Sequence, residues 1–300
     1  MAEGTSLLNL GELSKPITVF IEKVSDAVGG IAKPWQIQRV AKAEAVAAKL
    51  KASAQIEISD MEERALNRLI REAANEQETI ESITAGAIPY LNADVDASAL
   101  DEGWIRNLFD RGKNVTDIQM REIWSRILAE EANSAGSISR KTVEILSSMD
   151  KSDANIFSKI RSFVWNDNNP QIVYFMNFGS KEKYKYKLEY SDLWRMEEIG
   201  LLRFDISSDL IYTFTARNFI MDYFGRSIKF DFGSSGRNHL KRGNIQVTEA
   251  GKQLAKICAA EPDEAYLQGL LDLWLVFHNS VSISTTIESK QQWLAGGQRP

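Results

Sequence analysis

The sequence is poor in the residues that form covalent cross-links and soft metal sites. It contains one cysteine, Cys258, and two histidines, His239 and His278, in 300 residues. A single cysteine excludes an internal disulfide framework and a cysteine-rich zinc site. Two histidines far apart in the sequence also exclude a histidine-rich metal centre. We expect Cys258 and His278 to be structural residues.

Long apolar runs and an excess of one charge are also lacking. The longest apolar run, Leu270–Phe277, is interrupted by Asp272, whereas a membrane-spanning helix needs about 18 apolar residues. The start, Met1–Gly4, lacks the basic and apolar segments of a signal peptide. The net charge of -5 gives no overall attraction to nucleic acid or anionic lipid. We expect a cytoplasmic protein, in a bacterium-like reducing compartment, with no transmembrane segment.

No catalytic or cofactor motif is present in the sequence. The run Gly233–Gly236 is not followed by the Gly-Lys-Ser/Thr ending of a phosphate-binding loop. Glu130 and Glu131 are adjacent on a helix, so their side chains point about 100° apart, and we expect them at a solvated helix end. These features predict a protein that is not an enzyme and has no cofactor, no catalytic residue and no metal ligand.

The first apolar residues recur at helical spacing. They predict a helix that ends at Val28, with Ser14 as its cap, Pro16 in its first turn and Gly29 after its end. Such a helix packs on its own domain, or it rests on a membrane or a partner.

Residues 35–86 have a strongly helix-forming composition, with no proline or glycine between Pro34 and Gly86. They predict one long helix, or two helices with a break near 55–60. Within this segment a seven-residue apolar period, interrupted by Glu76, resembles a partial coiled-coil seam. This stripe, called the heptad stripe below, consists of Leu66, Leu69, Ala73, Ile80, Ile83 and Ala87. It either pairs with a second copy in a homo-oligomer or folds back on residues 98–164, and pairing would require Arg68 or Arg71 to neutralise Glu76.

Residues 98–164 read as four short helices, each too short to be stable alone in water. Tryptophans and aliphatic residues recur on one face of each helix, so the helices must pack together. The predicted starts are polar capping residues: Ser98, Thr116, Ser139 and Ser152.

Beyond Trp165 the pattern changes to short strands, two of them expected at 173–178 and 183–188. Lysines alternate with tyrosines and leucine in the second strand, which suits an edge strand protected by lysines or a strand that binds nucleic acid. Further cations lie in 237–243, which we interpret as a loop with His239 at an exposed tip. The candidate nucleic-acid contacts are Lys183, Lys185, Lys187, Arg237, His239, Lys241 and Arg242.

Residues 191–258 carry the most specific local pattern. A helix that ends at Gly200 is followed by short strands and by a capped helix start, Thr248–Gly251. This order resembles the winged-helix pattern, in which a β-wing leads into a Leu-Thr-x-x-Gly helix. Against nucleic-acid binding, Glu197 and Glu198 lie outward on the first helix and would repel phosphate. Residues 262–300 are expected to form a helix and a polar tail that includes Ser282–Thr286.

The central motif also resembles a known family. It runs Trp124-Ser125-Arg126-Ile127-Leu128-Ala129-Glu130-Glu131 and then Gly136-Ser137-Ile138-Ser139. It is similar to the bacterial family of domain of unknown function 2806, as are Lys33–Glu44 and Arg64–Arg68 upstream, and the likeness covers most of residues 15–255. The chain departs from that pattern at Gly103, Ser125, Glu130 and Ala135. The resemblance implies no catalytic residues, and a looser likeness to abortive-infection helical proteins implies a role in phage defence.

Together these observations predict a mainly helical protein. We expect an N-terminal helical segment (1–95), a central helical unit (96–168), a winged-helix-like α+β module (169–258) and a C-terminal helix with a polar tail (259–300). The expected function is that of an interaction protein without a catalytic site, bound to a protein partner or to its own copies. The alternative is a nucleic-acid-binding regulator.

Overall fold

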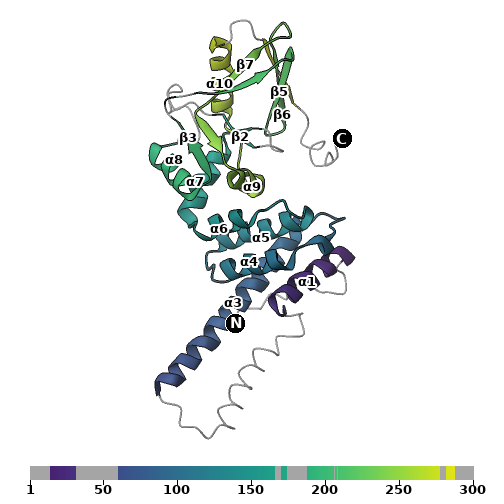
Figure 1. Ribbon diagram of the computed structural model, residues 1–300, viewed down its shortest axis with the longest axis vertical. Coiled ribbons are helices and arrows are strands. Elements are labelled where there is room, and N and C mark those ends of the chain that lie inside the picture. Colours follow the sequence, from purple (N-terminus) through teal and green to yellow (C-terminus); the bar gives the residue numbers. More distant parts are fainter. Residues whose placement is uncertain are drawn as a thin grey trace. The chain divides into compact units, whose positions relative to one another are not determined.

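The computed structural model describes residues 14–31, 60–165, 170–173, 188–205, 207, 209–277 and 282–287. The chain divides into two compact units, Met1–Ser147 and Ser148–Pro300. The first is helical and the second combines helices with antiparallel strands (Figure 1). The predicted mainly helical character, with helices first and a small antiparallel sheet region after them, is confirmed for these residues. The four-part division remains a prediction.

The described part of the first unit consists of α-helices joined by short 3-10 turns. None of the described helices in the chain is both long and apolar enough to cross a membrane. In order, the elements of this unit are α1 (Lys15–Val28), α3 (Asp60–Ala87), η2 (Ile88–Tyr90), η3 (Ala97–Ala99), α4 (Glu102–Gly112), α5 (Ile118–Asn133) and α6 (Arg140–Ser147).

Helix α1 lies where the sequence predicts it. Pro16 is in its first turn, and Gly29 ends it with a left-handed φ of 81° that suits glycine. Phe20 and Val24 are buried, and Arg106 of α4 donates a hydrogen bond from Nε to the Ala27 carbonyl at 3.1 Å. The apolar face of α1 is therefore packed on its own unit.

Two close contacts to α5 set the core of this unit. A Cβ on Gly86 of α3 would lie 2.6 Å from Ser125 Oγ, and one on Gly112 of α4 would lie 2.7 Å from the Trp124 ring. Both distances are shorter than real Cβ contacts allow, so each glycine lets a helix approach α5 closely. The lack of a side chain at these two glycines therefore lets α3 and α4 pack closely against α5.

The predicted helix starts need correction at three of four positions. Asp101, Asp117 and Asp150, rather than Ser98, Thr116 and Ser152, accept hydrogen bonds from backbone N–H groups at the starts of α4, α5 and α7 (Lys151–Arg161). A carboxylate is favoured there because it also interacts with the positive end of the helix dipole. The fourth start is right, since Ser139 Oγ accepts from the Thr142 N–H at 3.1 Å.

The described part of the second unit carries all the strands. Its helices besides α7 are α8 (Tyr190–Ile199), α9 (Glu249–Ile257) and α10 (Glu264–Phe277). Its strands are β1 (Val164–Trp165), β2 (Gln171–Ile172), β3 (Leu202–Phe204), β4 (Leu210–Phe214), β5 (Asn218–Tyr223), β6 (Arg226–Asp231), β7 (Asn238–Gly243), β8 (Ile245–Val247) and β9 (Ser282–Ile287).

All the strand pairs described are antiparallel. β1 pairs with β2, β3 with β8, and β4 with β7, while β6 lies between β5 and β9. Strands β4 to β7 are therefore inserted in sequence between the two paired strands β3 and β8.

Two predicted irregular segments are strands, and both predictions were wrong. The expected loop 237–243 contains β7, whose Leu240 is buried, because its backbone pairs with β4. The expected polar tail at Ser282–Thr286 lies in β9, which pairs with β6. Both segments are strands because their backbones pair with a strand that is distant in the sequence. Their local pattern of apolar side chains is too weak to predict this.

The core of the second unit is a cluster of buried aromatic rings. Trp165 lies 4.9 Å from Tyr223 and 5.4 Å from Trp274, centroid to centroid, and Phe163 meets Tyr266 edge-on at 4.8 Å. Trp165 donates from Nε1 to the Tyr266 hydroxyl at 2.9 Å, which satisfies its buried polar edge. Burial also raises the pKa of Tyr223 well above its usual value. This cluster joins β1, β5 and α10 into one core.

The pattern that runs from Gly200-Leu201-Leu202 to Thr248-x-x-Gly251 has a direct physical basis. Gly200 ends α8 with a φ of 94°, and Thr248 Oγ1 donates to the Gly200 carbonyl at 2.7 Å. The same hydroxyl accepts from the Gly251 N–H at 3.1 Å and so caps α9. A Cβ on Gly251 would lie 2.2 Å from the Leu201 carbonyl oxygen. Threonine and glycine at these positions therefore dock the start of α9 on the end of α8.

Candidate functional site

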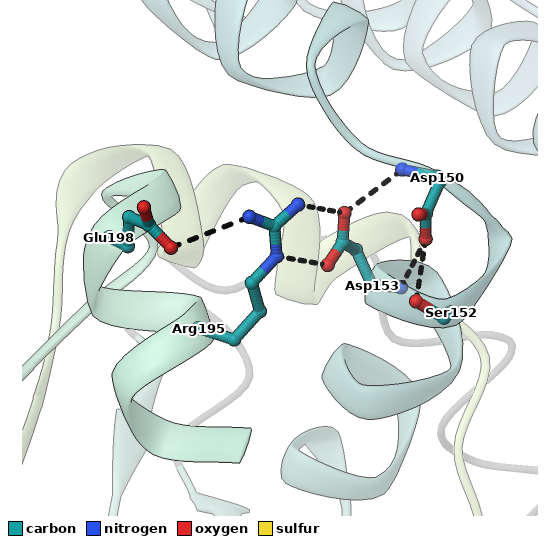
Figure 2. A network of polar contacts seen from close by, with 5 residues as sticks. All are labelled: Asp150, Ser152, Asp153, Arg195 and Glu198. Atoms are coloured by element: carbon teal, nitrogen blue, oxygen red, sulfur yellow. Dashed lines mark hydrogen bonds and ion pairs between the residues drawn. The ribbon is translucent and has the colours of Figure 1, made fainter. Parts of the chain in front are cut away.

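The polar network of α7 and α8 centres on a buried carboxylate (Figure 2). Asp153 is 1% exposed and receives two hydrogen bonds from Arg195, at 2.7 Å from Nε and 2.9 Å from Nη2. It also accepts from the Asp150 N–H at 3.0 Å, which completes a capping box at the start of α7. The bonds to Asp153 hold the pKa of the Arg195 guanidinium above its usual range. The buried charge is therefore fully engaged in joining two helices.

The outer face of α8 is exposed and combines aromatic and acidic side chains. Trp194 is 62% exposed and Tyr190, one turn earlier, is 39% exposed. Glu197 and Glu198, one turn later, are also exposed. Leu193 and Met196 are buried on the opposite side and hold the helix in place. We call Tyr190, Trp194, Glu197 and Glu198 the Trp194 face.

The cationic side chains of β7 are divided between different environments. Lys241 lies 3.1 Å from Asp209 and over the Phe277 ring, 5.0 Å from its centroid. Arg242 is half-buried, with its guanidinium 4.8 Å from the centre of the Tyr212 ring. Alternation along the strand directs neighbouring side chains to opposite faces. The structure therefore does not bring Lys241 and Arg242 together as one cationic surface.

The remaining predicted nucleic-acid contacts fall into two groups. Arg237 and His239 are exposed, and His239 Nδ1 lies 3.2 Å from Thr213 Oγ1 on the paired strand. Lys183, Lys185 and Lys187 lie outside the described residues, as does His278. Cys258 is partly exposed at the end of α9.

The heptad stripe lies on α3 and is divided between two environments. Ile80 and Ile83 are buried in the half of α3 that packs on α5, where Thr79 accepts from Arg121 at 3.4 Å. Leu69 is 57% exposed, Ala73 is exposed and Leu66 is half-buried. The C-terminal half of the stripe thus folds back on the predicted 98–164 helices.

Glu76 forms an ion pair with another helix of its own unit. Its carboxylate lies 3.2 Å from Lys113 Nζ, at the end of α4, rather than against Arg68 or Arg71. Arg68 lies 3.6 Å from Glu72 on the same helix. The fold-back on α4 and α5 brings Lys113 within reach.

Glu131 is buried, whereas the sequence predicts a solvated helix end. It is 3% exposed, and its two carboxylate oxygens accept from the Gly136 N–H at 2.7 Å and the Ile138 N–H at 2.8 Å. Trp104 donates from Nε1 to the Ile138 carbonyl at 2.8 Å. Burial raises the pKa of Glu131 in spite of these bonds. The chain turns back after α5. Glu131 therefore stabilises this turn and does not lie at a solvent-facing helix end.

The described residues contain no group of three His, Cys, Asp or Glu side chains placed to hold a metal ion. The buried carboxylates Glu131 and Asp153 bond to backbone N–H groups and to Arg195. Their geometry suits structural roles.

A family model described as "Protein of unknown function (DUF2806)" matches residues 63–271, which is more than half of the chain. The chain belongs to the DUF2806 family. The resemblance of the central motif is thereby confirmed, while Lys33–Glu44 precedes the matched range. No curated protein and no solved structure matches the chain.

The motif that the chain shares with DUF2806 can be explained by packing. Trp124 stacks against the α4 end at Gly112, Glu131 holds the turn at Gly136, and Ile138 accepts from Trp104. At Glu130 the side chain is only half-buried. The motif therefore builds the helical core.

Sequence reasoning did not identify the Trp194 face or the Asp153–Arg195 pair. Trp194 lies in the helix predicted to end at Gly200, but its exposure depends on which side of the helix Leu193 and Met196 bury. Asp153 and Arg195 are 42 positions apart, and no local pattern pairs them. The i to i+4 spacing of Tyr190 and Trp194 was the one signal available.

Proposed function

We propose that this member of DUF2806 is a cytoplasmic interaction protein without catalytic activity, which assembles with its own copies through the N-terminal half of α3. The observation that carries the proposal is the exposure of that half. Met61 and Leu69 are 70% and 57% exposed on a helix whose other half is packed on α5. Burying each large side chain would yield about 1.5–3 kcal/mol. A second copy supplies the same apolar stripe and is the occupant we propose.

Light scattering of the wild type and of Leu69→Glu tests the assembly. The wild type should be larger than a monomer at tens of micromolar protein, and Leu69→Glu should shift it towards the monomer. Asn67→Glu is the matched control, because Asn67 is exposed on the same helix and receives the same charge away from the stripe. A monomeric wild type would contradict the proposal. If the wild type is an oligomer and Leu69→Glu has the same mass, the contact between copies does not lie on α3. Ile80 is unsuitable as the probe, since it is buried within the chain.

Phage defence is the biological process we propose for this interaction. Its support is the likeness of the central motif to abortive-infection helical proteins. Deleting the gene and challenging the host with a broad phage panel should change the plaque counts. Unchanged counts across the panel would remove the defence role and leave the assembly proposal to its own test.

Nucleic-acid binding through a winged-helix-like module is the second candidate. Its support is that Arg237 and His239 are both exposed at the start of β7, which pairs with β4. Two observations count against it. Lys241 forms an ion pair with Asp209, and Glu197 and Glu198, which are exposed on α8, would repel phosphate. Duplex DNA and RNA should bind at about 50 mM salt and lose affinity in Arg237→Ala. If neither nucleic acid binds at that salt, this function is abandoned.

A further inference from the structure

Two aromatic side chains of the Trp194 face, Tyr190 and Trp194, are exposed to solvent. Tyr190 and Trp194 are four residues apart, so both rings lie on one side of α8. Aromatic side chains that are exposed together are typical of the energetic centre of a protein interface. A single scattered apolar residue would need no such explanation.

The charge around these rings is negative. Glu197 and Glu198 are exposed one turn after Trp194, and Glu197 Oε1 accepts from the Phe204 N–H at 3.3 Å. Arg195, on the same helix, donates two hydrogen bonds to the buried Asp153, whose charge balances its own, and one from Nη1 to Glu198 at 3.4 Å (Figure 2). Arg195 therefore leaves the face with a net negative charge.

We propose that the Trp194 face binds an arginine-bearing segment of a partner protein. A guanidinium stacks on an indole or phenol ring and also forms paired hydrogen bonds with a carboxylate. The Trp194 face offers both aromatic rings and carboxylates within about two turns of one helix. Lysine matches the charge but not the planar stacking, so the partner segment should be richer in arginine.

This inference rests on the proposed interaction function but uses a surface on α8 and not on α3. Its test can therefore fail without affecting the assembly test. Leu69→Glu should leave arginine-segment binding unchanged, and Trp194→Ala should leave the light-scattering mass unchanged.

The probe is a fluorescently labelled deca-arginine peptide, titrated with the full chain at low salt and followed by anisotropy. Trp194→Ala, which leaves the charge unaltered, should raise the dissociation constant about tenfold. Ile220→Ala is the matched control, because Ile220 is 56% exposed on β5 and lies outside the face. A deca-lysine peptide of equal charge should bind more weakly than deca-arginine.

Several results would overturn the proposal. Deca-arginine is attracted to any acidic protein by net charge, so equal binding by wild type and Trp194→Ala would show that only net charge acts. Absence of binding by the wild type, or equal loss in Ile220→Ala, also contradicts it. A drop in molecular mass in Trp194→Ala would assign the face to a second copy of this chain instead. Near-ultraviolet circular dichroism establishes that each variant is folded.

Discussion

At the residue scale, Glu131 gives the first prediction. Glu131→Ala should lower the free energy of unfolding by about 1–3 kcal/mol, because the buried Ile138 N–H and the N–H of Gly136 in the turn lose their acceptors. Glu131→Gln should recover part of this loss, since its amide oxygen still accepts one bond. Urea denaturation measures both changes. An Ala variant as stable as the wild type would contradict the structural role of this carboxylate.

The pH dependence of Glu131 follows from its raised pKa. A carboxyl group whose pKa is higher in the folded state than in the unfolded state binds more protons when folded. Stability from this group is therefore present below the unfolded pKa, about 4.3, and is lost as pH rises through the raised folded value. The stability difference between wild type and Glu131→Gln should move in favour of the variant as pH rises from 4 to about 7. A difference that is constant with pH would show that Glu131 has no raised pKa.

The Asp153–Arg195 pair gives a second residue-scale prediction. The effect of Asp153→Asn on stability should have opposite signs in the wild type and in Arg195→Ala. Arg195→Ala should destabilise the protein strongly, because it leaves a buried carboxylate without its counter-ion. Asp153→Asn alone should also destabilise the wild type, since it weakens the bonds to Arg195. In the Arg195→Ala background, however, Asp153→Asn should raise the melting temperature by removing the uncompensated charge. Additive losses in the double variant would contradict coupling between the two side chains.

At the element scale, the docking of α9 gives the third prediction. Gly251→Ala should cost about 1–3 kcal/mol, because the new methyl group overlaps the Leu201 carbonyl and α9 must shift. Thr248→Val should cost about 1 kcal/mol through loss of the α9 cap. Gly236→Ala is the matched control, since a Cβ there meets no atom within 4 Å. Equal stability of Gly251→Ala and Gly236→Ala in thermal unfolding would contradict the close approach of α9.

The elements that the sequence predicts best are those with local signals. α1 and α8 end at glycines with left-handed backbones, and Thr248 caps α9, so short patterns identify all three. β9 could not be predicted in this way. Its serines and threonines give no clear apolar pattern, and its partner β6 is more than 50 residues away in the sequence. The burial of Glu131 likewise depends on a turn that returns to it. Strand pairing and buried polar contacts are tertiary properties, and periodicity does not encode them.

At the scale of the whole molecule, each compact unit has its own apolar core. In the first, Phe20, Ile83, Trp124 and Leu128 are buried among helices. In the second, the Trp165 aromatic cluster holds strands and α10, and Tyr223 donates to the Ser162 carbonyl at 2.9 Å. The candidate surfaces, by contrast, lie on single helices. Their helices could be predicted from sequence, but their exposure follows only from how each unit packs.

The last prediction concerns the second unit by itself. A fragment of residues 148–300 should fold alone, because a unit of this length with its own core is typical of an autonomous domain. Its near-ultraviolet circular dichroism should show ordered aromatic side chains, and it should unfold in one cooperative urea transition. The control fragment 162–300 lacks α7, which supplies Asp153 for Arg195 and the Arg161 Nε bond of 2.7 Å to the Ala255 carbonyl. That deletion removes the contacts of α7 with α8 and with the end of α9, so the shorter fragment should lose the transition. If 148–300 shows no cooperative unfolding, its core needs the first unit, and the two units form one folding domain.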